Sequence, residues 1–155
     1  MKTTIIATGK LKERYWREAC EEYVRRLSAS TTMAVIEIAD RDPARLGADR
    51  ALGVEGADIL KALPAGAWVI ALTIEGEQRS SEELAARIEA LKLAGQSHLC
   101  FVIGSSHGLA PEVLARADEN LSFGPITLPH NLARVVLLEQ LYRAACITAG
   151  SPYHK

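Results

Sequence analysis

Cysteine is scarce in this chain, and the few that occur do not form a recognisable framework. Cys20, Cys100 and Cys146 are an odd number, and no two of them are close in sequence. This spacing argues against a disulfide-stapled secreted domain and against a CxxC metal knuckle. It favours a reducing compartment, and we therefore expect a cytoplasmic protein.

An excess of charge of one sign and long apolar runs are also missing. The formal net charge is −1, so bulk attraction to polyanions is not expected and any contact with nucleic acid has to be local. No apolar stretch is long enough to span a bilayer, and the run after Met1 is too short for a signal peptide. With 155 residues and 48% hydrophobic residues, the chain fits one globular domain over 1–155, with no membrane contact.

Strand-like and helix-like segments alternate along the chain. Apolar segments typical of strands cover 2–8, 33–38, 68–74, 99–103 and 121–123. Helical periodicity covers 11–27, 50–63, 81–94, 111–117 and 131–149, and we interpret 40–49 and 75–77 as loops. This order predicts an α/β fold with a mostly parallel sheet and helices on both faces. Ligands of such sheets bind at the carboxyl ends of the strands, here after Leu72, Ile103 and Phe123.

The last helix is apolar almost all round, from Leu132 to Ile147. A monomer of this size covers one face of a terminal helix more readily than both, so we expect a homodimer partner to cover the rest. The alternative is a helix buried between the sheet and other helices of its own chain.

Several motifs of common active sites are absent. The chain has no GxGxxG after a strand, no GxxxxGK[ST] and no HExxH, which leaves dinucleotide and P-loop sites without support. We expect no metal site, because the four histidines lack the spacing of metal ligands. These are His98, His107, His130 and His154.

Residues 104–108 match the G-x-S-x-G pattern of a hydrolase nucleophile elbow, between an apolar strand and a helix. A serine hydrolase would use Ser106 as nucleophile, Asp118 as the orienting acid and His130 or His154 as the base. The chain is short for that fold, the helix begins several residues late and no HGGG-type oxyanion motif occurs upstream. The alternative is a glycine-bracketed turn that lets backbone approach a ligand.

The C-terminal third carries a second group of polar residues. His130 follows Pro129 at the start of the last helix, and Glu139 and Arg143 are spaced for an ion pair along that helix. In the tail, Tyr153 and His154 are side chains that can stack on a base and exchange protons, although a frayed terminus is the simpler interpretation.

These segments resemble the large-subunit ribosomal RNA methyltransferase H family, which belongs to the SPOUT superfamily of knotted methyltransferases. The resemblance extends over the whole chain, and its most specific part is C-terminal. It is carried by 127–130, 134–135, 139–144, 147–148 and 152–154, with support from 23–26, 36–38, 72–76, 101–104 and 108–109. The family usually has a second glycine where this sequence has Ser105.

The resemblance implies a homodimeric enzyme that uses S-adenosyl-L-methionine to methylate N3 of a pseudouridine in 23S ribosomal RNA, within assembled ribosomes. It also implies a SPOUT-type fold whose C-terminal segment forms a trefoil knot. The cofactor would contact three segments at the strand ends. By position these are Leu72, Gly104 and the run Phe123, Gly124, Pro125, Ile126, Thr127 and Leu128.

For catalysis we expect His130, or Tyr153 with His154, to accept the proton of the pseudouridine N3. Arg143 is expected to hold a phosphate or to stabilise the developing anion. Two alternatives to this enzyme are the serine hydrolase at Ser106 and a ribosome-binding module that has lost the cofactor through Ser105.

Basic residues near the N-terminus form a candidate RNA-binding patch, although interleaved glutamates also suit an ordinary mixed-charge helix face. The patch comprises Lys10, Lys12, Arg14, Arg17, Arg25 and Arg26.

Overall fold

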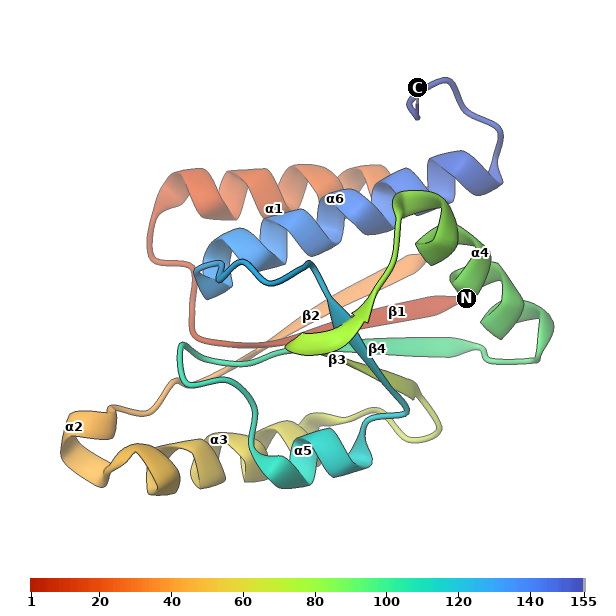
Figure 1. Ribbon diagram of the computed structural model, residues 1–155. Helices are drawn as coiled ribbons and strands as arrows, with labels where there is room; N and C mark the ends of the chain where they lie inside the picture. Colours follow the sequence, from red (N-terminus) through yellow and green to blue (C-terminus); the bar gives the residue numbers. More distant parts are fainter. Residues whose placement is uncertain (155) are drawn as a thin grey trace.

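The computed structural model describes residues 1–154, in which a five-stranded sheet lies between two layers of helices (Figure 1). The strands are β1 (Lys2–Thr8), β2 (Thr32–Ile38), β3 (Trp68–Gln78), β4 (His98–Ile103) and β5 (Glu119–Ser122). All neighbouring strands run parallel, in the order β2-β1-β4-β3-β5. The predicted fold class, a parallel α/β sheet, is confirmed.

Helices cover both faces of the sheet, as predicted (Figure 1). One layer contains α1 (Arg14–Leu27), α4 (Ser81–Leu93) and α6 (His130–Thr148), and the other contains α2 (Pro43–Leu46), α3 (Ala48–Ala62) and α5 (Pro111–Arg116). Each layer closes its own apolar core against the sheet. Among the helices described, none combines the length and apolar character needed to cross a membrane.

Two predicted loops are wrong. Within 40–49 the chain forms α2, because Asp42 accepts a hydrogen bond from Ala44 N at 2.9 Å and Pro43 occupies the first helical turn. Residues 75–77 continue β3, because β5 pairs with two separate parts of it. The pairing covers residues 70–72 and then, after a register shift, Glu77 and Gln78.

The register shift makes residues 73–76, here called the β3 arch, pass closely over β5. At Gly76, an added Cβ would lie 2.7 Å from the carbonyl carbon of Leu121 and 2.8 Å from that of Asn120. Ser122 Oγ donates to Ile74 O at 2.8 Å and ties the arch to β5. A glycine is therefore required where the two backbones meet.

Glu119 anchors β5, the edge strand, to the rest of the domain. Its carboxylate accepts hydrogen bonds from Trp68 Nε1 at 2.8 Å, Arg79 Nη1 at 2.8 Å and Arg87 Nε at 2.9 Å. Burial raises the pKa of this carboxyl, but the donors from Arg87, Arg79 and Trp68 outweigh that effect and hold the pKa below its ordinary value. The charged form therefore stabilises the fold.

We expect Glu119→Gln to lower the free energy of unfolding by about 2 kcal/mol at neutral pH, since charge-assisted hydrogen bonds are lost. Because the folded-state pKa is depressed, this contribution is present above pH 4.5 and is lost as the pH falls. Urea titrations between pH 7 and 3 should show a shallower loss of stability in the variant than in the wild type. Glu18→Gln, at an exposed pair on α1, serves as the control, and equal pH profiles for Glu119→Gln and wild type would contradict the prediction.

Candidate functional site

A cleft of about 430 Å³ opens at the carboxyl ends of β4 and β5 and beside residues 72–74 of β3, within the range of roughly 300–1,000 Å³ that small-molecule sites occupy. Seven of the eight residues predicted to contact a cofactor line it, and only Pro125 does not. The seven are Leu72, Gly104, Phe123, Gly124, Ile126, Thr127 and Leu128. The sheet topology thus brings three distant segments to one place, as parallel strands predict.

Sequence reasoning missed several other residues of the lining, which are neighbours of the predicted ones. They are Thr73, Ile74, Ile103, Ser105, Ser106, Gly108, Pro129 and Ala133. Their position next to a predicted contact residue, in a strand, in the turn after it or at the start of α6, is the signal that could have identified them.

The wall formed after β4 is a tight turn that depends on Gly104. Gly108 N donates to Ser105 O at 2.9 Å and closes the turn. At Gly104 an added Cβ would collide with the carbonyl oxygen of Gly108, so the chain doubles back on itself there. Ser105, which replaces a glycine of the family pattern, accepts a hydrogen bond from His107 N through its Oγ at 3.4 Å.

The cleft is apolar and presents peptide groups in place of charged side chains. Of the described residues that line it, none is Asp, Glu, Lys or Arg. Within residues 1–154, the peptide groups of Ile126, Thr127 and Leu128 make no backbone hydrogen bond. Because these peptide groups are not used by the fold, they are open to a ligand, and this segment can bind the polar edge of a group such as an adenine, whose ring system suits the apolar wall.

His130 and the buried Arg134 join the cleft to the first strand. His130 lines the cleft, and a Cβ on Gly9 would lie 2.9 Å from its Nε2. Arg134 is 1% exposed, donates to Glu37 Oε1 at 2.6 Å and to Gly9 O at 2.8 Å, and leaves its Nε without a partner among described residues. The sequence motif singled out Arg134, but nothing in it indicated this burial.

The G-x-S-x-G turn holds no catalytic triad. Ser106 Oγ lies 3.2 Å from Nδ1 of His107, an exposed neighbour in sequence. The Asp118 carboxylate accepts hydrogen bonds from Val69 N at 2.7 Å and from Arg116 at 3.3 Å. Since Asp118 orients no histidine, the geometry does not support the serine hydrolase. Nor does any group of three possible metal ligands occur in the part of the chain that the structure describes.

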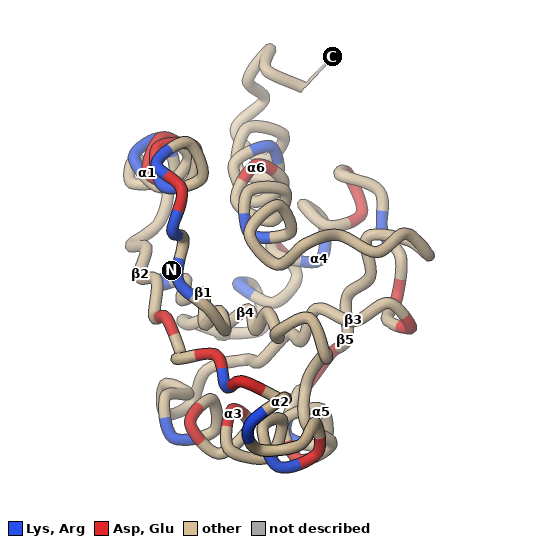
Figure 2. The backbone as a smooth tube through the Cα atoms, turned by 90° about the vertical axis from the view of Figure 1, so that its left-hand side faces the viewer, with Lys and Arg blue, Asp and Glu red and all other residues tan. Residues whose placement is uncertain are grey.

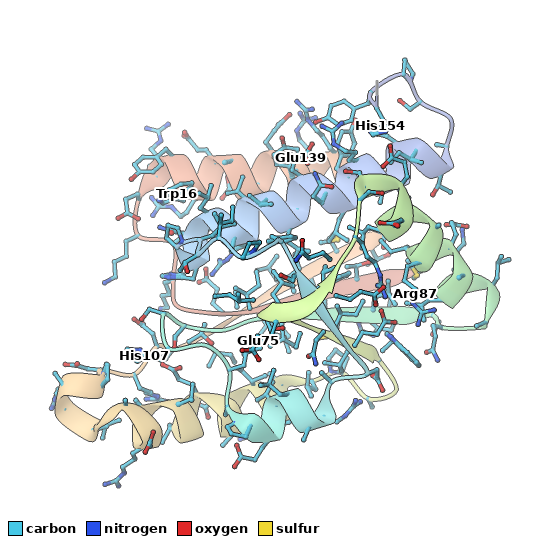
Figure 3. All side chains as sticks on the ribbon, in the orientation of Figure 1. Trp16, Glu75, Arg87, His107, Glu139 and His154 are labelled. Atoms are coloured by element: carbon cyan, nitrogen blue, oxygen red, sulfur yellow. The ribbon has the colours of Figure 1, made fainter. Side chains whose placement is uncertain are left out.

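Arg143, Tyr153 and His154 come together in a second cluster near the other end of α6, here called the tail cluster. Figure 3 shows the position of its His154 beside Glu139. Arg143 forms a two-pronged contact with Glu139, with Nη2 at 2.6 Å and Nε at 3.0 Å from Oε1. Tyr153 OH donates to the same oxygen at 3.3 Å, and the Arg143 guanidinium lies 4.9 Å from the Tyr153 ring centroid. His154 Nε2 lies 2.7 Å from an oxygen of Glu82 on α4, a partner that the sequence did not reveal.

The surroundings of Tyr153 limit its chemistry. Burial raises the pKa of Tyr153 to about 12, and hydrogen bonding to Tyr23 and the nearby Glu139 carboxylate act in the same direction. The phenol therefore stays protonated at neutral pH and donates hydrogen bonds. As placed in this chain, Tyr153 is not suited to be a general base.

The tail cluster and the cleft are separated along α6. Arg143 follows His130 by thirteen residues, which is about 20 Å at the rise of an α-helix. The residues predicted to act on the substrate therefore divide into His130 in the cleft and three side chains at a distance from it.

Comparisons with known proteins identify relatives of the whole chain. The family described as Predicted SPOUT methyltransferase matches residues 1–154. A protein of Rubrobacter xylanophilus, named ribosomal RNA large subunit methyltransferase H, is 54% identical over 99% of this chain and 98% of its own length. Proteins of the same name from Bifidobacterium animalis and Listeria monocytogenes are 52% and 45% identical over the full length of both chains.

A solved structure supports the fold alone. A probable methylase family protein from Haemophilus influenzae superposes with a TM-score of 0.57 at 13% identity. The match covers 99% of this chain and 70% of the other.

Proposed function

The chain belongs to the SPOUT methyltransferase family, and from this membership we propose that it is an S-adenosylmethionine-dependent enzyme that methylates N3 of a pseudouridine in 23S ribosomal RNA. The structural observation that carries the proposal is the uncharged cleft, built from three strand ends, with the free peptide groups of residues 126–128. Full-length relatives at 45% to 54% identity, all named as ribosomal RNA methyltransferases, support the substrate class.

The cleft fits the cofactor in size and in the kind of donors and acceptors it offers. S-adenosylmethionine supplies an electrophilic methyl group attached to a sulfonium. Leu72, Gly104 and residues 123–128 would hold its adenosine through apolar contacts and peptide hydrogen bonds. By fixing the direction of approach, these residues contribute to the rate through alignment.

The acceptor N3–H has to lose its proton during methyl transfer. His130 is the titratable side chain on the cleft wall, and we assign it or His154 as the acceptor of this proton, directly or through water. Tyr153, as a protonated phenol, would donate a hydrogen bond to the nucleobase of the substrate. Arg143 would hold a phosphate or the developing negative charge.

These roles require a second copy of the chain. The tail cluster is too far from the cleft of its own subunit, but an antiparallel partner would bring its tail cluster to that cleft. The surface of α6 supports such a homodimer, because Leu132, Val135 and Val136 remain half-buried in the single chain. Figure 2 shows α6 lying between α1 and α4. Covering these three side chains with a partner would remove apolar surface from water.

We extend the proposal to the trefoil knot, the domain and the location. The β3 arch passes tightly over β5, and the segment after β5 continues on to α6 (Figure 1), which supports a C-terminal segment threaded through a loop. Residues 1–155 would act as one methyltransferase domain. Assembled ribosomes in the cytoplasm would be the site of action.

The direct test is methyl transfer to ribosomes from a strain that lacks the modification. Labelled methyl groups from S-adenosylmethionine should appear at one pseudouridine of 23S RNA, mapped by mass spectrometry. Calorimetry with S-adenosylmethionine separates this enzyme from a ribosome-binding module that has lost its cofactor. Absence of both binding and transfer would reject the proposal.

Arg143→Ala and His154→Ala are each expected to lower kcat by roughly 100-fold or more, because a positioned proton acceptor and a charge-stabilising group are lost. The affinity for S-adenosylmethionine should stay unchanged in calorimetry, since the cleft of the same chain is intact. Lys61→Ala, which removes an exposed cation in the last turn of α3 in the opposite helix layer, is the matched control. An unaltered kcat would remove the substituted residue from the mechanism.

Mixing two defective variants tests whether one site uses two chains. Chains with Gly104→Ala keep the tail cluster, and chains with Arg143→Ala keep the cleft. In a mixed dimer, one site would have neither defect, so activity should return on mixing. Failure to recover activity in dimers shown to have exchanged subunits would place the tail cluster in its own subunit's site.

A further inference from the structure

The segment that links β1 to α1, residues 9–13, borders the cleft without lining it. A Cβ on Gly9 would lie 2.9 Å from His130 Nε2, and Arg134 Nη2 donates to Gly9 O at 2.8 Å. Both contacts are made by the first turns of α6, which form one wall of the cleft. The segment is therefore fixed beside the opening through which a substrate would enter.

A second anchor holds the other end of this segment. Arg17 Nη1 donates to Leu11 O at 3.0 Å and to Lys12 O at 2.6 Å, and the Leu11 side chain is buried. Lys10 and Lys12 are exposed and flank Leu11. Two cations are thus displayed from a backbone that is held on both sides, which lowers the ordering cost of binding.

Most other cations of the N-terminal basic patch are already engaged. Arg14 pairs with Glu18 at 2.6 Å, and Arg25 and Arg26 pair with Glu22 at 2.7 Å. Lys10 and Lys12, in contrast, have no carboxylate within 4.0 Å among residues 1–154. Arg17 is held by the carbonyls of Leu11 and Lys12, so the two lysines are the members of the patch with neither a carboxylate nor a backbone partner among residues 1–154, and their charge is free to attract phosphates.

An exposed aromatic ring, that of Tyr15, follows Lys12 three residues later in the first turn of α1. Tyr15 is 61% exposed, and its ring centroid lies 5.1 Å from that of Trp16, which packs on the core and supports it (Figure 3). Bases of single-stranded RNA stack on such rings whatever their sequence.

Acidic residues restrict the direction from which RNA can approach. Asp40 and Asp42 belong to the segment that joins the carboxyl end of β2 to α2. Figure 2 shows acidic residues along this segment, towards the α2 and α3 layer. They would repel a phosphate backbone on that side. An RNA strand is therefore directed along the α1 and α6 layer, past Lys10 and Lys12 to the cleft.

We propose that Lys10, Lys12 and Tyr15 form an RNA-binding platform for the single-stranded nucleotides next to the methylated base. Tyr15 stacks on an unpaired base, and the two lysines bind the flanking phosphates. The inference rests on the proposed function, and it explains how a chain of near-neutral total charge recognises RNA locally.

The test compares the double variant Lys10→Ala/Lys12→Ala with the double variant Arg50→Ala/Lys61→Ala. The second is the control, because it removes two exposed cations of α3 and so changes the net charge by the same amount. With ribosomes lacking the modification, the KM of the platform variant should rise about tenfold, while kcat at saturation and S-adenosylmethionine affinity stay unchanged. The slope of log affinity against log salt should fall by about 1.4, because two phosphates of a single strand are no longer neutralised. The control should match the wild type.

Tyr15→Ala and Tyr15→Phe test the stacking. Tyr15→Ala should raise KM about tenfold, and Tyr15→Phe should preserve the wild-type value because the ring face remains. Retention of wild-type KM in both Tyr15→Ala and Lys10→Ala/Lys12→Ala would overturn the platform while leaving the proposed methyl transfer intact.

A binding measurement separates failure of the platform from failure of the proposed function. Fluorescence anisotropy with a fluorescein-labelled RNA stem-loop needs no methyl transfer, and the platform variants should bind it about tenfold more weakly than the wild type. Equal affinities would overturn the platform even if the wild type proved inactive. Weaker binding to ribosomes but equal binding to the stem-loop would also overturn it, since the contact would then be with a ribosomal protein.

Discussion

Replacing Gly104 by alanine should weaken the binding of S-adenosylmethionine by about 100-fold. An added Cβ would lie 2.6 Å from the carbonyl carbon of Gly108, besides colliding with its oxygen, and 3.0 Å from Leu109 Cγ. Backbone cannot give way as the end of a flexible side chain can, so the turn must open and the cleft wall must move. Forcing extra volume into a packed site costs about 1–3 kcal/mol, and the upper end of that range corresponds to the expected loss.

Gly53→Ala is the matched control for this substitution. Gly53 lies within α3, and an added Cβ would meet no atom within 4 Å. Alanine there should leave cofactor binding unchanged and raise stability by up to about 1 kcal/mol, because alanine is the better helix former. Calorimetry measures the affinity for the cofactor, and thermal unfolding measures the stability. Wild-type affinity in Gly104→Ala would show that the turn after β4 does not form the cofactor site.

Arg134→Met is expected to cost about 3 kcal/mol of unfolding free energy. The guanidinium is buried and is the partner of both Glu37 Oε1 and Gly9 O. Removing it leaves the carbonyl of Gly9 without that donor, and breaking a buried ion pair typically costs about 3–5 kcal/mol. The value expected is at the low end because the Glu37 side chain is 33% exposed and regains water.

Urea denaturation measures the effect, with Arg14→Met as control. The Arg14 side chain is 83% exposed in its pair with Glu18, so its loss should cost less than about 1 kcal/mol. The Arg134→Met variant should also bind RNA more weakly, because the platform segment loses its anchor at Gly9. Equal stabilities of the two variants would mean that the buried pair contributes little.

Much of the fold could be predicted because local patterns and the final structure agree. The apolar strands and helical periodicity predicted the parallel α/β order. At the start of α4 the local sequence and the structure also agree, because Ser80 and Glu83 form a capping box: Ser80 N donates to Glu83 Oε2 at 2.7 Å and Glu83 N donates to Ser80 Oγ at 3.2 Å. The Asp42-Pro43 pair was a readable signal for α2 that the interpretation as a loop overlooked. Residues 75–77 could not be assigned to β3 from their own composition, since β5 imposes that conformation.

The candidate functional site likewise has a part that the sequence predicts and a part that it does not. Residues 72, 104 and 123–128 could be expected to meet because strand ends of a parallel sheet share an edge. The separation of Arg143 from His130 was also calculable, at about 1.5 Å per helical residue, but the contacts of the tail were not. Neither Glu82 as the partner of His154 nor the burial of Arg134 has a signature in the sequence.

The position of α6 after all five strands has a consequence for synthesis. Its 19 residues fill the gap between α1 and α4, complete one apolar core and supply a wall of the cleft. A nascent chain that stops short of this helix would have neither a closed core nor a binding cavity. Translation thus delivers the activity only after α6 has been made, and a product terminated before α6 would be a substrate for proteases and not a half-competent enzyme.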